Sequence, residues 1–331
     1  MQFRILGPVE IQDERTGLRI LPTGAKQRAL LGALVVKSGQ VVSVHRLIDE
    51  LWGEHPPANA TNALQAHVAR LRRLLPQPEP GSGEQHHEWI VTRSLGYVLR
   101  LGRNTTCTTD ADRFNELAAQ GRAATADPQR AAELLRSALA LWRGPALEGS
   151  VRGDICAAEA AQLEENRLTV LETLYDAYLR ASRHDEIIGQ LEELTTDHPM
   201  RERFYDLLMV ALYRCGRQAE ALSVYDRARK RLVHELGVEP GPVLRRRMDA
   251  ILQHDPGLAA PGSDDHVAPV LQMPLPSRPG GASGGTGTDA TVLGLNGELS
   301  RLRHRIERIS LEQQELMRRF NQLVAHPAAG Q

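Results

Sequence analysis

The 331-residue sequence is poor in cysteine and has no long hydrophobic run. Its three cysteines, Cys107, Cys156 and Cys215, lie far apart with neither a CxxC spacing nor a histidine-rich partner. This argues against a zinc site or a disulfide framework and fits a reducing cytoplasm. The longest apolar run, Ala29 to Val36, is far shorter than the roughly 20 residues of a membrane span. The first residues lack the basic stretch and apolar core of a secretory signal, so we expect a cytoplasmic protein without a membrane partner.

Motifs that bind nucleotides, metals or acyl groups are missing as well. The sequence contains no GxxxxGK phosphate loop, no HExxH and no GxSxG. The glycine-rich run from Gly280 to Gly287 lacks the strand, helix and lysine that a nucleotide cradle requires. We therefore expect no catalytic residues, no cofactor and no metal.

The charge of the chain is nearly balanced but unevenly distributed. Forty Lys and Arg residues stand against 41 Asp and Glu residues, and a formal charge of −1 predicts no general affinity for nucleic acid. The first 100 residues carry 12 basic and 9 acidic side chains, or +3, whereas the remaining 231 carry 28 and 32, or −4. The amino-terminal third is the basic part, but so small an excess identifies a DNA-binding protein only together with a motif.

The first 60 residues predict short strands and two helices. Phe3 to Ile11 and Leu18 to Leu21 have the pattern of two extended segments joined by a turn, which predicts a hairpin. Helical spacing of apolar residues follows from Lys26 to Lys37. Ser43 is a suitable N-cap for a second helix, Val44 to Leu51.

A third helix, about Ala60 to Leu75, has two contrasting faces. At about 100° per residue, one face is apolar and consists of Leu64, Val68, Leu71 and Leu75. The opposite face combines small and polar residues, with Gln65 and Arg72 at its flanks: Asn62, Ala66, Ala69, Arg70 and Arg73. Arg, Asn and Gln match the hydrogen-bonding patterns of base edges in the major groove. The alternative is an ordinary amphipathic surface helix.

The segment after this helix has the pattern of a second hairpin. Beyond a loop rich in Pro, Gly and His, Pro76 to Glu88, the residues Trp89 to Leu99 alternate as two short strands around a tight turn. A hairpin in this position is typical of the wing in a winged helix. The sequence departs from the usual pattern where Ser94 and Leu95 precede Gly96, a place that is commonly richer in proline.

Several motifs in fixed order resemble one family. These are LGPVEI (6–11), KQRALLGALV (26–35), VVSVHRLIDELWGEHPP (41–57), NALQAHVARLRRLL (62–75) and VTRSLGY (91–97). The first 100 residues resemble an OmpR-type winged helix-turn-helix, and the motifs are similar to those of the Streptomyces antibiotic regulatory protein (SARP) family. The similarity continues through a bacterial transcriptional activator domain to about Asp255. The expected fold is mainly α with a small β component.

The resemblance also implies how DNA is contacted. The third helix is expected to enter the major groove, and the turn near Arg93 to reach the phosphate backbone or the minor groove. Arg70 matches the arginine expected to read bases. The other expected DNA contacts are Asn62, Gln65, Arg72, Arg73 and Lys26, of which Arg72 and Arg73 favour the DNA backbone. Lys26 fits a phosphate contact or simple solvation, and His67 lies where packing is expected.

From Thr109 onward the sequence predicts paired helices. An offset of 34 residues, the tetratricopeptide period, aligns two sets of residues. The sets are Ala177, Arg180, Arg183, Glu186 with Ala211, Arg214, Arg217, Glu220, and Ile187, Leu191, Leu194 with Ala221, Tyr225, Ala228. Such repeats commonly provide surfaces for protein contacts. A helical bundle without true repeats is the alternative.

The carboxyl-terminal part predicts a tether and a further helix. Residues 256–290 are dominated by Gly, Pro, Ser and Ala, which favours a flexible linker. In 291–325, ten positions from Val292 to Leu323 follow steps of three and four, and all except Gln313 are apolar. This heptad pattern predicts a coiled coil, with a helix that docks on its own chain as the alternative.

The sequence thus predicts four regions: a winged helix-turn-helix (1–101), an activator domain (109–255), a linker (256–290) and a heptad helix (291–325). The resemblance implies a transcriptional activator of an antibiotic biosynthetic cluster that is associated with the nucleoid. As a homodimer it would bind direct repeats near the −35 element of double-stranded promoter DNA. It would recruit RNA polymerase through the sigma factor, the C-terminal domain of the α subunit or the β flap. The alternatives are a protein-interaction scaffold or ligand sensor, and a repressor with the same DNA contacts.

Overall fold

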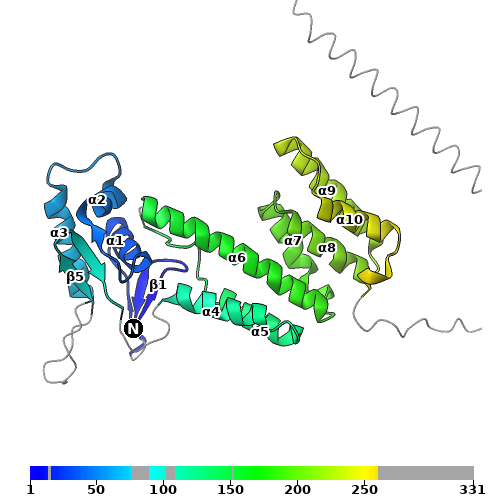
Figure 1. Cartoon of the computed structure of the whole chain (residues 1–331), viewed down its shortest axis with the longest axis horizontal. Coiled ribbons are helices and arrows are strands. Elements are labelled where there is room, and N and C mark those ends of the chain that lie inside the picture. The colour runs from blue at the N-terminus through cyan, green and yellow to red at the C-terminus, as the bar shows by residue number, and fades with distance from the viewer. Residues whose placement is uncertain (14–15, 76–88, 102–108, 151–152, 260–331) are drawn as a thin grey trace, which may run out of the picture. The chain divides into compact units, whose positions relative to one another are not determined.

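The computed structural model describes residues 1–13, 16–75, 89–101, 109–150 and 153–259. Short strands and three helices form the amino-terminal part, and helices alone form the rest (Figure 1). The predicted fold class, mainly α with a small β component, is confirmed. The loop 76–88, the heptad segment 291–325 and all but the first residues of the predicted linker lie outside the described residues.

The chain begins with a small antiparallel sheet. Its strands follow one another in sequence order: β1 (Gln2–Arg4), β2 (Glu10–Gln12) and β3 (Arg19–Ile20). The prediction of one extended segment from Phe3 to Ile11 was wrong, because the chain reverses and pairs Phe3 with Ile11. Gly7 permits this reversal, since its φ of 137° is a conformation that residues with a side chain rarely adopt.

Three helices form the body of the amino-terminal part: α1 (Ala25–Val36), α2 (Val44–Trp52) and α3 (Ala60–Leu74). The Ser43 hydroxyl accepts a hydrogen bond from the Arg46 amide at 3.3 Å and begins α2 as predicted. Most of α1 is buried, and α2 and α3 pack against it and against each other. The apolar faces of the three helices therefore close one core.

A second sheet contains the predicted hairpin. Its strands lie in the order β4-β6-β5, with β4 (Val42–Ser43), β5 (Ile90–Arg93) and β6 (Gly96–Leu99). The two-residue turn of Ser94 and Leu95 joins β5 to β6. The strand β4 was not predicted, because a strand of two residues has no periodicity to detect.

The rest of the described chain is helical. Its elements are α4 (Asp110–Ala123), α5 (Pro128–Leu139), α6 (Asp154–Arg180), η1 (Asp185–Ile187), α7 (Ile188–Asp197), α8 (Glu202–Arg214), α9 (Gln218–Leu236), α10 (Pro242–Leu252) and η2 (Pro256–Leu258). Figure 1 shows α4 and α5 alongside α6, and α8 beside α10. The apolar sides of these helices are buried against one another.

Residues that the 34-residue offset aligns make the same contacts in both copies. Arg183 forms two hydrogen bonds of 2.6 Å with Glu186 after α6, and Arg217 forms bonds of 2.6 and 2.7 Å with Glu220 after α8. The small and apolar residues that the offset aligns are buried, apart from the half-buried Leu194: Ala177, Ala211, Ile187, Leu191, Ala221, Tyr225 and Ala228. The helices that follow Thr109 therefore include a repeated helix pair.

Asp110, the first residue of α4, ties the helical part to the first sheet. Its fully buried carboxylate accepts hydrogen bonds from the amides of Ile5 at 2.7 Å and Leu6 at 3.1 Å. Arg143 donates to the same carboxylate at 3.1 Å and forms an ion pair with Glu10 at 3.0 Å. Desolvation raises the pKa of Asp110 above its ordinary value, against the opposite effect of the amides and Arg143.

Glu50 makes a similar connection in the other direction, from the amino-terminal part to the helical part. This buried residue of α2 accepts hydrogen bonds from the amides of Ile155 at 2.7 Å and Cys156 at 3.0 Å, in the first turn of α6. A carboxylate at a helix amino terminus satisfies free N–H groups and interacts favourably with the helix dipole. The first turn of α6 is thus capped by a residue of the helix-turn-helix.

The folded helical part extends slightly beyond the predicted boundary at Asp255. Leu258, in η2, is buried, and its carbonyl accepts a hydrogen bond from Arg214 of α8 at 2.9 Å. Residues Pro256 to Leu258 were assigned to the linker by composition, and this assignment was wrong. The buried Leu258 side chain and this hydrogen bond hold the turn against α8.

Candidate nucleic-acid interface

The helix α3 has the two faces that its sequence predicts. Its apolar stripe is almost completely buried and consists of Leu64, Val68, Leu71 and Leu75. The residues expected on the opposite face are exposed: Asn62, Ala66, Ala69, Arg70 and Arg73, together with Gln65 at the flank. The amides and guanidiniums of α3 therefore point away from the core of the protein.

The arginines on this face have no acidic partner within the part of the chain that the structure describes. Among the described residues, Arg70 and Arg73 form no ion pair, and Asn62 and Gln65 form no side-chain hydrogen bond with another residue of α3. The small side chains between them let the helix axis approach a flat or grooved surface closely. The face thus offers hydrogen-bond donors and positive charge that no other described residue engages.

Arg72 differs from its neighbours because it contacts the wing. Its guanidinium donates to the carbonyl of Ile90 at 2.7 and 3.0 Å and to the hydroxyl of Thr92 at 2.8 Å. Ile90 and Thr92 belong to β5, so Arg72 holds the hairpin against the flank of α3. Its contact with the DNA backbone stays a prediction, and its role in supporting the wing was not foreseen.

Lys26 and His67 both lie near the ring of Trp52, the last residue of α2. The Lys26 ammonium lies 5.1 Å from the centre of the Trp52 ring, and the His67 ring lies 6.0 Å from it. Burial and the charges of Arg70 and Lys26 lower the pKa of His67, which favours the neutral imidazole. His67 thus packs as expected, whereas Lys26 remains a predicted phosphate contact with a second partner in Trp52.

The wing places an exposed arginine beside α3. Arg93 ends β5 and is exposed, with no ion pair among the described residues. Across the hairpin, Gly96 lies so close to β4 that an added Cβ would be 1.9 Å from the Val42 carbonyl oxygen. Only glycine permits this approach, so Gly96 holds the turn against the start of α2.

The sequence did not predict two residues that hold the helix-turn-helix against the helical part of the chain. Glu50 and Arg143 each bond to the opposite part of the chain. Glu50 is a charged residue beside the apolar Leu47 and Leu51, an irregularity that could have drawn attention. Arg143 lies in a Trp-Arg-Gly-Pro segment, whose composition is typical of a helix end. No local pattern shows which distant backbone groups they meet.

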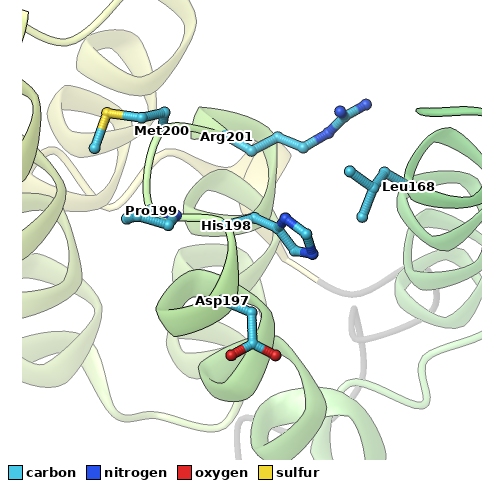
Figure 2. A pocket seen from close by; sticks show the side chains of 6 residues that line it. All are labelled: Leu168, Asp197, His198, Pro199, Met200 and Arg201. Carbon is cyan, nitrogen blue, oxygen red and sulfur yellow. The ribbon is translucent and has the colours of Figure 1, made fainter. Parts of the chain in front are cut away.

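A shallow hollow lies in the helical part, between α6 and the turn from α7 to α8 (Figure 2). It has a volume of about 430 Å³ and is lined by Leu168, Asp197, His198, Pro199, Met200 and Arg201. Arg201 already forms ion pairs with Glu165 and Glu172 of α6. Within the described residues, no helix is long and apolar enough to cross a membrane, and no cluster of side chains suits a metal ion.

Comparisons with known proteins agree with this arrangement. A model described as "Transcriptional regulatory protein, C terminal" matches residues 19–99, and one described as "Bacterial transcriptional activator domain" matches residues 109–252. The chain is 45% identical over 269 residues to the transcriptional regulator RedD of Streptomyces coelicolor, which covers 80% of this chain and 73% of RedD. It is 37% identical over 279 residues to the regulatory protein DnrI of Streptomyces peucetius, covering 82% of this chain and 100% of DnrI.

A solved structure has the same architecture. Mycobacterium tuberculosis EmbR, in complex with a low-affinity phosphopeptide, superimposes with a TM-score of 0.68 at 34% identity, covering 77% of this chain and 65% of EmbR. The two matched models and the identity to RedD and DnrI show the family. The chain belongs to the Streptomyces antibiotic regulatory protein family of transcriptional activators.

Proposed function

We propose that this activator binds double-stranded promoter DNA through α3, which enters the major groove. The observation that supports this most is the exposed face of α3, where Arg70 and Arg73 have no acidic partner among the described residues. Guanidiniums without an intramolecular partner are available to guanine edges and phosphates. We assign base contacts to Asn62, Gln65 and Arg70, and backbone contacts to Arg73, Arg93, Lys26 and Arg72.

The proposed base reader, Arg70, gives the direct test. Replacement of Arg70 by Ala should cost about 1–3 kcal/mol of binding to the specific site and relax the preference at one base pair. Binding to random duplexes should change little. Gel-shift titrations of the full chain against both kinds of duplex measure this difference, with Arg113→Ala as a control at an exposed arginine of α4 that is paired with Glu116. Equal losses on specific and random DNA would contradict base reading by Arg70.

We propose further that the DNA-bound protein activates an antibiotic biosynthetic cluster. Two copies would bind direct repeats near the −35 element and recruit RNA polymerase through the sigma factor, the C-terminal domain of the α subunit or the β flap. The activator domain supports this proposal, because Asp110 and Glu50 join it directly to the DNA-binding part. Such a protein would be found at the nucleoid.

Footprinting with purified polymerase tests this second step. On a promoter of the cluster, the protein should protect two direct repeats and extend the footprint of polymerase over the −35 element. Transcription from the same template should increase. Protection of the repeats together with reduced transcription would identify a repressor, and the absence of any specific footprint would favour a protein-interaction scaffold.

A further inference from the structure

The tip of the wing presents an apolar side chain to solvent. Leu95, the second residue of the turn between β5 and β6, is 74% exposed, the highest value among the exposed large hydrophobic residues of the described chain. Its neighbours in the hairpin, Arg93 and Ser94, are also exposed. Burial of a leucine side chain is favourable because it removes apolar surface from water. Leu95 obtains almost none of this stabilisation within the described protein.

The tip is nevertheless held in place from two sides. The Leu95 carbonyl accepts a hydrogen bond of 3.1 Å from the amide of Val44, the first residue of α2. The close approach of Gly96 to β4 fixes the same end of the hairpin. On the other strand, Arg72 of α3 bonds to Ile90 and Thr92. The position of Leu95 relative to α3 and to the start of α2 is therefore fixed by backbone and guanidinium contacts.

Positive charge borders this leucine. Arg93 lies two residues before it, and His45 and Arg46 are exposed in the first turn of α2, whose first amide bonds to Leu95. Among the described residues, neither Arg46 nor Arg93 forms an ion pair. One exposed apolar side chain, with an exposed arginine on its own hairpin and another in the adjoining first turn of α2, suits a narrow surface with anionic walls. The minor groove of B-DNA, about 6 Å wide between two rows of phosphates, has this form.

We propose that Leu95 enters the minor groove next to α3 and selects base pairs that lack an amino group there. This inference rests on the proposed function, because a hairpin on the flank of a helix in the major groove extends over the phosphates toward the adjacent minor groove. Apolar side chains recur among minor-groove contacts. Guanine carries an N2 amino group on the groove floor, and a leucine over it leaves that donor without an acceptor. Leu95 therefore favours A·T over G·C beneath the wing.

Base analogues separate this contact from the contacts of α3. A pair of hypoxanthine with cytosine has the major-groove face of G·C but lacks the amino group of the minor groove. We would place A·T, hypoxanthine·C or G·C at each position flanking the α3 contacts and titrate the full chain against each duplex. At one or two positions, A·T and hypoxanthine·C should bind alike, and both about tenfold more tightly than G·C.

Replacement of Leu95 by Ala should abolish this tenfold preference. Its dependence on salt should be unchanged, because no charge is removed. The matched control is Leu18→Ala, at another leucine that is largely exposed, which should keep the preference. A preference that survives in Leu95→Ala, or is absent from the unmodified protein, would overturn the proposal while leaving the Arg70 test intact. Normal DNA binding by Leu95→Ala with loss of polymerase recruitment would instead assign Leu95 to a protein contact and also overturn it.

Discussion

The exposed arginines of α3 and the wing differ in their surroundings from the arginines between the helices of the activator domain. In the activator domain they bond to carboxylates within and between helices, as Arg203 does with Asp176 and Asp206. On α3 and at the tip of the wing, Arg70, Arg73 and Arg93 form no ion pair among the described residues. The same side chain therefore holds helices together in one part and remains available for a ligand in the other. The number of arginines in a region does not distinguish these uses, but their partners do.

The largest loss of stability is expected when the buried carboxylate partner of paired arginines is removed. Asp206 is buried in α8 and accepts hydrogen bonds from Arg203 and from Arg247 of α10, each at 2.6 Å. Asp206→Ala leaves both guanidiniums without this carboxylate and should lower the free energy of unfolding by about 3 kcal/mol. Urea denaturation measures this loss. The folded fraction should bind DNA as before, because the face of α3 is unchanged.

An exposed pair supplies the control for this variant. Arg217 and Glu220 are both exposed, so solvent screens their attraction. Glu220→Gln should leave the urea midpoint unchanged within error. If Glu220→Gln destabilised the protein as much as Asp206→Ala, the distinction between buried and exposed pairs would be wrong.

Replacement of Asp110 should cause the next largest loss of stability, and this loss should depend on pH. Asparagine offers one acceptor oxygen where the carboxylate serves two amides, so Asp110→Asn should cost about 1–3 kcal/mol of stability. Because burial raises the pKa of Asp110, the folded protein retains a proton that the unfolded chain releases above the ordinary carboxyl pKa. The stability of the unmodified protein therefore falls as the pH rises toward the raised pKa.

Denaturation of both proteins at a series of pH values tests whether stability falls or rises with pH. The advantage of the unmodified protein over Asp110→Asn should be largest below the ordinary carboxyl pKa and should shrink as the pH rises. An advantage that grows with pH would show that the two amides and Arg143 outweigh desolvation.

The smallest effect, a modest loss of DNA affinity, is expected from replacing an unpaired arginine that we propose contacts a phosphate. Arg73→Gln should weaken binding to all duplexes alike and reduce the slope of log affinity against log salt by about one. The matched control is Arg217→Gln, since Arg217 is engaged by Glu220 in the activator domain. Salt titrations of both variants test the contrast directly. Equal slopes for Arg73→Gln and the unmodified protein would remove Arg73 from the DNA contacts.

The sequence predicted the elements of the site well because helical periodicity is a local property. The spacing of Leu64, Val68 and Leu71 placed Arg70 and Arg73 on the solvent side of α3, as the structure has them. The reversal at Gly7 was missed, because glycine is compatible with both an extended segment and a turn. The turn at Leu258 was missed for a related reason: its stability comes from Arg214, 44 positions earlier in the chain.

The sequence by itself determined the order of helices, the wing, the 34-residue repeat and the polar face of α3, since each follows from residues only a few positions apart or from a fixed period. Only the tertiary structure decided that Arg72 supports the wing, that Glu50 caps α6 and that Asp110 binds the turn after β1. Those contacts join residues 18 to 106 positions apart. The partner of a polar side chain at such a separation depends on how the whole chain packs, and no local pattern encodes it.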